Sequence, residues 1–202
     1  MSDRRLSEVI IGVTGHRTLA DPKPIFSGVD RALEAIKTCF AAECLAILSP
    51  LAEGADRIVA DRALAIDGTK MIAILPMPIE IYQDDFQSSS SRVEFHDLLQ
   101  LAEEVIELPR TAQRKDSYRN AGEYLVTHCD VLIAIWDGLP ARGPGGTAEV
   151  IMLARDRNMP LAWIYARPVV SEKGKTTTPG AKHGDIYFER FPECAEHPEW
   201  RV

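Results

Sequence analysis

A glycine-rich segment, Gly143–Thr147, has the residue types of a phosphate-binding loop. It follows the apolar run Val131–Trp136 and precedes Ala148–Arg155, where apolar residues recur with helical spacing. At such a junction the unpaired N–H groups of the first helical turn point at a ligand, and the helix dipole favours negative charge. Glycine also lets a phosphate approach the backbone, because no Cβ stands in the way. We therefore expect an anion site here, the alternative being a glycine-rich connection that binds no ligand.

Three residues of this loop are the expected phosphate donors, because Pro144 has no backbone N–H. They are Gly145, Gly146 and Thr147. The loop matches neither GxGxxG nor GxxxxGKS/T, which argues against a typical dinucleotide-dependent dehydrogenase or ATPase.

Two potential cations follow the apolar run Val9–Val13. Gly15 would let a phosphate come close, and His16 and Arg17 would carry positive charge to it. Arginine is suited to this task because its guanidinium can hold a phosphate with two hydrogen bonds. The alternatives are a surface ion pair for Arg17 and an ordinary loop position for His16.

Two carboxylates follow the second apolar run, Leu45–Leu48. Glu53 and Asp56, with Gly54 between them, fall at the start of a predicted helix. They either complement the positive end of the helix dipole or bind ribose hydroxyls, as acidic residues do at this level of nucleotide-binding folds. Pro76, after the third run, would add an apolar wall for a base.

Glu149 lies in the first turn of the helix after the glycine-rich loop and is the candidate catalytic residue. A carboxylate beside the anomeric carbon of a nucleoside phosphate would stabilise an oxocarbenium-like transition state or activate water. Asp137 and Glu53 are the next candidates for that task. Asp137 and Gly138, which end the run before the loop, are also expected to contact the ribose or base.

The elements that position these residues alternate along the chain. Strands are predicted at Val9–Val13, Leu45–Leu48, Met71–Leu75, Glu104–Leu108, Val131–Trp136 and Leu161–Tyr165. Helices are predicted at Pro24–Phe40, Asp56–Leu64, Arg92–Ala102, Tyr118–His128 and Ala148–Arg155. Uninterrupted apolar strands separated by helices predict a three-layer, Rossmann-like α/β fold with a mostly parallel sheet. The candidate residues follow strands, so they should meet at the carboxyl edge of that sheet.

The length of 202 residues suits one domain, which we place at residues 1–167. Residues 168–202 are predicted to form a polar loop or tail, since Lys173–Gly180 is rich in Lys, Thr and Gly.

A net charge of −7 argues against a nucleic-acid partner. No apolar run is long enough to span a membrane and no signal peptide is evident, so a cytoplasmic location is expected. The four cysteines show no metal-binding spacing, and we expect no metal and no cofactor.

Four motifs together resemble the SLOG superfamily, which includes LOG-type phosphoribohydrolases, DprA-like proteins and sensor domains of bacterial defence systems. They are Gly-His-Arg at 15–17, Ala-Glu-Gly-Ala-Asp at 52–56, Trp-Asp-Gly at 136–138 and Gly-Gly-Thr-Ala-Glu at 145–149. The resemblance spans residues 9–165. It implies a Rossmann-like fold that binds a nucleotide or nucleotide-derived ligand, often as a homodimer.

One departure from the family pattern bears on function. LOG enzymes carry PGGxGTxxE, with a catalytic glutamate three residues after the threonine. Here Glu149 follows Thr147 by two residues, and on a helix one residue corresponds to about 100° of rotation. We therefore expect a ligand sensor, with a separate effector protein as a possible partner. The alternative is a LOG-like hydrolase or transferase that cleaves the N-glycosidic bond of a nucleoside 5′-monophosphate.

Overall fold

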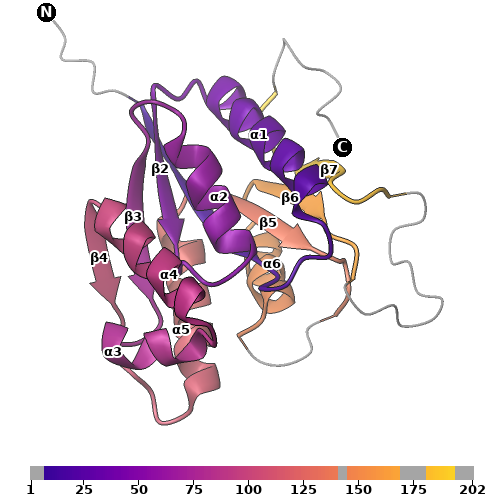
Figure 1. The fold of residues 1–202 in the computed structure, drawn as a ribbon. Helices are drawn as coiled ribbons and strands as arrows, with labels where there is room; N and C mark the ends of the chain where they lie inside the picture. Colours follow the sequence, from indigo (N-terminus) through magenta and orange to yellow (C-terminus); the bar gives the residue numbers. More distant parts are fainter. Residues whose placement is uncertain (1–6, 141–144, 169–180, 194–202) are drawn as a thin grey trace, which may run out of the picture.

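The computed structural model describes residues 7–140, 145–168 and 181–193. They form one seven-stranded sheet with helices on both faces (Figure 1). The strand order is β4-β3-β2-β1-β5-β6-β7, and every neighbouring pair is parallel except β6 and β7. The predicted α/β, Rossmann-like, mostly parallel fold is confirmed.

The elements have the following bounds. The strands are β1 (Glu8–Gly15), β2 (Cys44–Ser49), β3 (Lys70–Leu75), β4 (Glu104–Glu107), β5 (Val131–Trp136), β6 (Leu161–Tyr165) and β7 (Ile186–Glu189). The helices are α1 (Pro22–Cys39), α2 (Ala55–Leu64), α3 (Ile79–Tyr82), the 3-10 helix η1 (Gln83–Asp85), α4 (Ser89–Leu101), α5 (Arg114–His128) and α6 (Thr147–Asp156).

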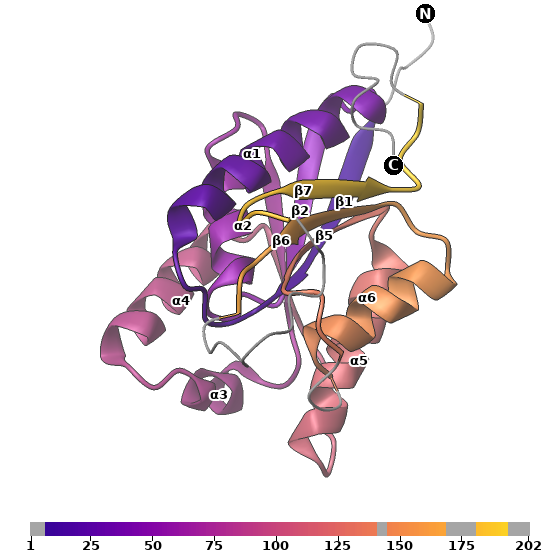
Figure 2. The ribbon, with the colours of Figure 1, turned by 90° about the vertical axis from the view of Figure 1, so that its right-hand side faces the viewer.

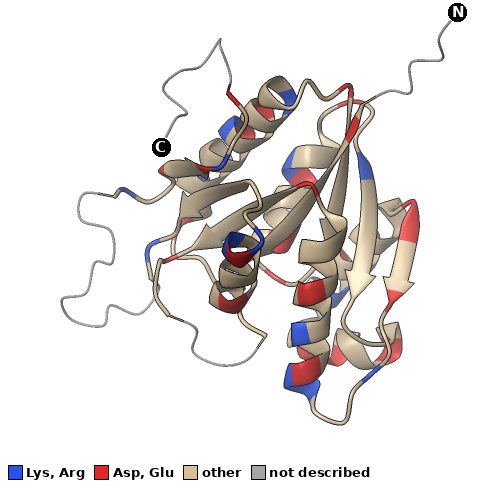
Figure 3. Cartoon of the chain, turned by 180° about the vertical axis from the view of Figure 1, so that it is seen from behind, with Lys and Arg blue, Asp and Glu red and all other residues tan. Residues whose placement is uncertain are grey.

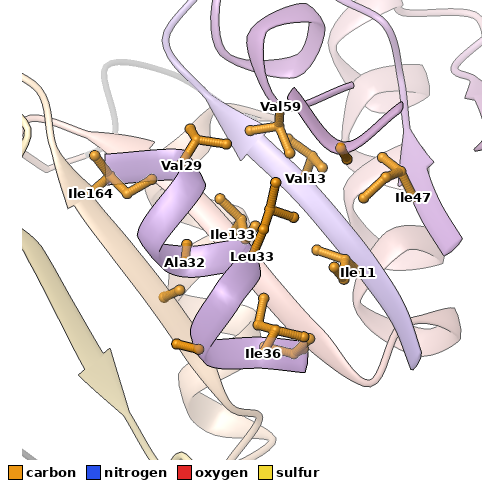
Figure 4. Packing of buried hydrophobic residues seen from close by; sticks show 14 of the residues in the cluster. Ile11, Val13, Val29, Ala32, Leu33, Ile36, Ile47, Val59, Ile133 and Ile164 are labelled. Carbon is orange, nitrogen blue, oxygen red and sulfur yellow. The ribbon is translucent and has the colours of Figure 1, made fainter. Parts of the chain in front are cut away.

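Helices α1, α2 and α4 cover one face of the sheet, and α5 and α6 cover the other (Figures 1 and 2). The apolar stripe of α1 explains its position. Val29, Leu33 and Ile36 recur with helical spacing and pack onto Ile11 of β1 and Ile133 of β5 (Figure 4). Each of these five side chains is 1% exposed or less. Every side chain of β5 is buried, so this central strand is covered on both faces, as its uninterrupted apolar sequence requires.

The chain reverses its direction of travel across the sheet between β1 and β5. From β1 it moves outward through β2, β3 and β4, and it then returns to place β5 against the free side of β1. The two strands are in register to their ends, where Gly15 pairs with Ile135. The loops that leave β1 and β5 diverge to opposite faces, and this topological switch point is where open α/β sheets bind ligands.

Several element boundaries differ from the sequence prediction, three of them as follows. Strand β1 continues to Gly15, because pairing with β5 extends it. Helix α4 begins within the serine run, where the hydroxyl of the N-cap Ser88 accepts the N–H of Ser91 at 3.0 Å. Helix α5 begins at Arg114 rather than Tyr118. Polar first turns carry no apolar periodicity, so the sequence pattern underestimates such helices.

The range 168–202, predicted as a loop or tail, contains the strand β7. Phe188 of β7 is 3% exposed and joins the core beneath α1. Arg155 of α6 donates two hydrogen bonds to the Glu189 carboxylate, at 3.0 and 2.6 Å. A four-residue strand in polar surroundings gives too short a pattern to be recognised. The segment Lys173–Gly180, on which the prediction of a tail was based, lies outside the described residues.

Acidic and basic residues are interspersed on the face that carries α5 and α6 (Figure 3). Within the described ranges, no helix is both long enough and apolar enough to cross a membrane.

Candidate ligand-binding site

A cavity of about 560 Å³ lies at the carboxyl ends of β1 and β5. Two predicted phosphate-binding segments meet in it. They contribute Gly15, His16, Arg17, Gly145, Gly146 and Thr147 to its lining. Gly143 and Pro144, the first residues of the glycine-rich loop, lie outside the described residues.

The predicted ribose- and base-binding residues divide into two groups. Asp56, Pro76 and Asp137 line the cavity. Glu53, Gly54 and Gly138 do not, and neither does the candidate catalytic residue Glu149.

The amino terminus of α6 presents backbone donors to the cavity. Gly146 is the N-cap residue, and its carbonyl accepts the N–H groups of Glu149 and Val150. Among the hydrogen bonds of the described residues, none uses the N–H of Gly146, Thr147 or Ala148, which all line the cavity. Three adjacent donors at the positive end of a helix dipole form a favourable environment for an anion.

Gly145 has a different role from the one expected. Its φ of +76° lies in the left-handed region, and a Cβ there would lie 2.8 Å from Cβ of Tyr118 and 3.0 Å from the carbonyl oxygen of Lys115. Its N–H donates to Oε2 of Glu149. Gly145 therefore lets the loop pack against α5, and its N–H is already engaged.

Glu149 is held by contacts on both carboxylate oxygens. Oε2 accepts the N–H of Gly145, and Oε1 accepts from Nε of Arg119 at 3.0 Å. These two interactions, the Gly145 N–H first, lower the pKa of Glu149. The carboxylate fastens α5, α6 and the loop to one another rather than facing the cavity.

Gly15 and Gly54 allow α2 to dock on β1. A Cβ on Gly15 would lie 2.3 Å from Cβ of Ala55 and 2.8 Å from the carbonyl oxygen of Ile135. Gly54 has a φ of +78°, and a Cβ there would lie 2.3 Å from the carbonyl oxygen of Arg17. Both glycines are thus needed for close backbone packing, which fixes the path of the loop that carries Arg17.

His16 connects the end of β1 to the end of β5. Its Nε2 lies 3.2 Å from both the backbone nitrogen and Oδ1 of Asp137. The same Oδ1 accepts the N–H of Leu139 at 3.0 Å, in a turn where Gly138 adopts a φ of +77°. Asp137 is 3% exposed, so this cluster forms a fixed part of the cavity wall.

Two cationic side chains converge on Asp85, which follows α3. Nη2 of Arg17 lies 3.7 Å from one of its oxygens, and Nη2 of Arg114 donates to the other. The Arg17 guanidinium also lies over the ring of Tyr118, 5.4 Å from its centroid. All four residues line the cavity.

Arg114, Tyr118 and Asp85 were not predicted from the sequence to be site residues. Arg114 begins the helix after β4, so it also stands at the carboxyl edge of the sheet. A survey of charged residues after every predicted strand would have included it. No local motif marks it.

Asp56 is, with Asp137, one of two buried carboxyl groups that line the cavity, and 4% of its surface is exposed. Its Oδ2 accepts the N–H of Ala52 at 3.1 Å. Burial raises its pKa to about 7, although the Ala52 N–H and the positive charges of Arg17 and Arg57 act in the opposite direction. This group therefore changes its charge near neutral pH.

Glu53 points to a different surface depression. Its Oε1 accepts a hydrogen bond from the hydroxyl of Ser91, and the residue lies with Arg17 and Ser88 beside the start of α4.

The described part of the chain contains no group of three or more His, Cys, Asp or Glu residues arranged to hold a metal ion. Cys44 and Cys129 are free thiols, and Cys194 lies outside the described ranges.

The fold and the site together define an α/β protein of Rossmann-like architecture with a cavity at its switch point that is lined by both charged and apolar residues. No profile of a known protein family matches the sequence, and neither does any curated protein. Among solved structures, the chain is similar to the X-ray structure of TM1055, a target of the Northeast Structural Genomics Consortium. The two are 15% identical, with a TM-score of 0.44, over 77% of this chain and 72% of TM1055.

Proposed function

We propose that this protein binds a nucleotide or nucleotide-derived ligand, of the nucleoside phosphate or ADP-ribose type, and acts as a SLOG-type ligand sensor. One observation carries the proposal. Gly146, Thr147 and Ala148, whose N–H groups have no hydrogen bond among the described residues, line a cavity at the switch point, and Arg17 lines the same cavity. Backbone donors at a helix amino terminus, together with a guanidinium, match the oxygen atoms of a phosphate.

The extent of the cavity supports a ligand larger than a phosphate. It reaches from Gly146, beyond β5, to Pro76 and Tyr82, beyond β3. Those strands are separated by three interstrand steps, about 14 Å at the usual spacing. Pro50 and Pro76 would contact a ribose or base at the end away from the phosphate, where Asp56 supplies a polar group.

Binding is favoured over hydrolysis by the position of Glu149. A hydrolase needs a carboxylate beside the anomeric carbon. Both oxygens of Glu149 are engaged, by Gly145 and Arg119, and the residue does not line the cavity. In the hydrolase alternative, the catalytic carboxyl group would have to be Asp56, Asp85 or Asp137, which do line it.

A panel of nucleotides separates these possibilities. Purified protein is incubated with orthophosphate, AMP, GMP, CMP, UMP, ADP and ADP-ribose, and each sample is assayed by thermal melting and by chromatography of the products. A ligand at a hundred times its Kd adds about 2.7 kcal/mol of stability and should raise Tm by several degrees. We expect such a shift without release of free base. Base release would establish the hydrolase, and no shift with any member would refute nucleotide binding.

Gly146→Val tests the contribution of the backbone donors. Gly146 has a φ of −88° and a ψ of 166°, which valine also adopts, so the fold should persist. The branched side chain would stand beside the donors and should abolish the nucleotide-dependent shift in Tm. Met152→Val is the matched control, because Met152 lies on the same helix and is 61% exposed. Equal shifts in Gly146→Val and the wild type would show that the phosphate binds elsewhere.

The proposal includes a homodimer and a separate effector protein, which the resemblance to sensor domains implies. Light scattering of the panel samples measures the first of these. A monomeric mass both with and without the bound nucleotide would remove the homodimer from the proposal.

A further inference from the structure

We propose that Asp56 is a specificity-determining residue of the cavity, which takes up a proton when an anionic ligand binds and then donates a hydrogen bond to an acceptor atom of that ligand. This inference rests on the proposed function, because it requires a ligand with negative charge near Arg17. It differs from the role expected from the sequence, in which an ionised carboxylate accepts hydrogen bonds from ribose hydroxyls.

The geometry gives Asp56 one engaged oxygen and one available oxygen. Oδ2 accepts the N–H of Ala52, whereas Oδ1 has no hydrogen bond among the described residues. Asp56 lines the cavity while being only 4% exposed. A buried carboxylate with a single neutral donor is poorly compensated for its lost hydration, so the neutral acid is favoured there.

The charged groups around Asp56 determine how a ligand would act on it. Arg17, from the loop after β1, and Arg57, from α2 itself, both favour the ionised form. Arg57 is buried and already paired with Glu94, at 2.5 Å. Asp85, from η1, lies 3.7 Å from Arg17 and partly offsets its charge.

Tyr82, at the end of α3, completes the surroundings of Asp56. Its phenol is buried, and both burial and the nearby Asp56 charge raise its pKa, so it stays neutral. Arg17 is therefore the only one of these groups expected to change partner when an anion enters the cavity. A phosphate bound to Arg17 would cancel the positive charge that favours ionised Asp56 and would add negative charge of its own.

The consequence is a proton taken from solvent. With its pKa at about 7, Asp56 is about half protonated near neutral pH, so binding should take up as much as half a proton there. With the added proton, the Asp56 carboxyl group carries an O–H, so Oδ1 can donate a hydrogen bond. A ring nitrogen or carbonyl on a base, or a ribose oxygen, would accept its hydrogen bond.

Calorimetry tests this inference directly. ADP-ribose is the main probe, because the two negative charges of its doubly esterified diphosphate do not titrate near neutral pH, whereas a phosphomonoester has a second pKa near 6. Titrations at pH 7.0 in buffers of different ionisation enthalpy give the number of protons taken up. AMP and orthophosphate, corrected for their own titration, are measured in parallel.

The wild type should take up about half a proton at pH 7.0 and much less at pH 5.5, where Asp56 is already protonated. Its Kd should rise by as much as about tenfold per pH unit above pH 7. Asp56→Asn should show no uptake and a pH-independent Kd, and should bind more tightly than the wild type at pH 8. A damaged site would instead lose affinity. Asp67→Asn, in an exposed loop after α2, is the control and should behave as the wild type.

The outcomes separate the two proposals. Binding without proton uptake, or uptake that persists in Asp56→Asn, would overturn this inference and leave the proposed function intact. If Asp56→Asn does not fold, the pH dependence of proton uptake by the wild type decides the question. Proton uptake whose midpoint lies far from pH 7 would belong to another titrating group and would overturn the inference. Absence of binding by all three probes at every pH would overturn the proposed function, and this inference with it.

Discussion

At the scale of single residues, Asp56 makes the stability of the free protein depend on pH. Its pKa is raised from 3.8 to about 7, so the folded state holds a proton that the unfolded state releases above about pH 4. The free energy of unfolding should therefore fall as pH rises between about 4 and 7, by at most about 1.4 kcal/mol per pH unit from this group, and level off above 7.

Asp56→Asn should remove that dependence. Denaturant unfolding of the wild type and of this variant from pH 4 to pH 8 measures the difference. The variant should gain stability relative to the wild type as pH rises, and Asp67→Asn should not. Parallel curves for Asp56→Asn and the wild type would mean that the buried carboxyl has an ordinary pKa.

Some residues of the site could be predicted from the sequence and others could not. Gly146, Thr147 and Arg17 follow apolar strands, and the carboxyl ends of parallel strands share one edge, so their meeting in one cavity is expected. The role of Glu149 could not be predicted, because it depends on Arg119, thirty residues earlier in the chain. Sequence patterns locate a residue on an element, but they do not reveal which element packs against it.

At the scale of elements, glycine governs how α2 meets β1. Gly15→Ala would place a Cβ 2.3 Å from Ala55 and 2.8 Å from a backbone carbonyl, so an element must shift. Overpacking of this kind costs about 1–3 kcal/mol. The comparison is Gly68→Ala, where φ is +78° but a Cβ would meet no atom within 4 Å, so only the left-handed strain of about 1 kcal/mol remains.

Denaturant unfolding of both variants measures this difference. Gly15→Ala should lose more stability than Gly68→Ala, and it should also weaken nucleotide binding, because the loop that carries Arg17 rests on α2. A Gly15→Ala protein as stable as Gly68→Ala would show that the α2–β1 contact can relax. From the sequence, Gly15 was expected to contact a phosphate. Its packing against α2 could not be predicted, because the identity of a glycine does not show whether a ligand or another backbone lies beside it.

At the scale of the whole molecule, β7 forms one edge of the sheet, next to β6. Phe188 is 3% exposed, and the preceding turn is fixed to α1 by Arg31, which donates to the carbonyl of Gly184 at 3.0 Å. Phe188→Ala should therefore destabilise the fold by about 3–5 kcal/mol, measured as a fall in Tm or in the denaturant midpoint. Tyr187→Ala, on the other face of the strand and only partly buried, should cost less. A small effect of Phe188→Ala would show that β7 is dispensable for the rest of the sheet.

Helix α6 is attached at both ends, by Glu149 to Arg119 near its start and by Arg155 to Glu189 near its end. The donors at its amino terminus therefore stand in place before a ligand arrives, and a nucleotide need not wait for the helix to move. At 0.1 M salt the repulsion between the acidic protein and an anion extends only about 10 Å. Association should accordingly be fast and nearly the same for related nucleotides, and differences in affinity among them should lie in how long each one stays bound.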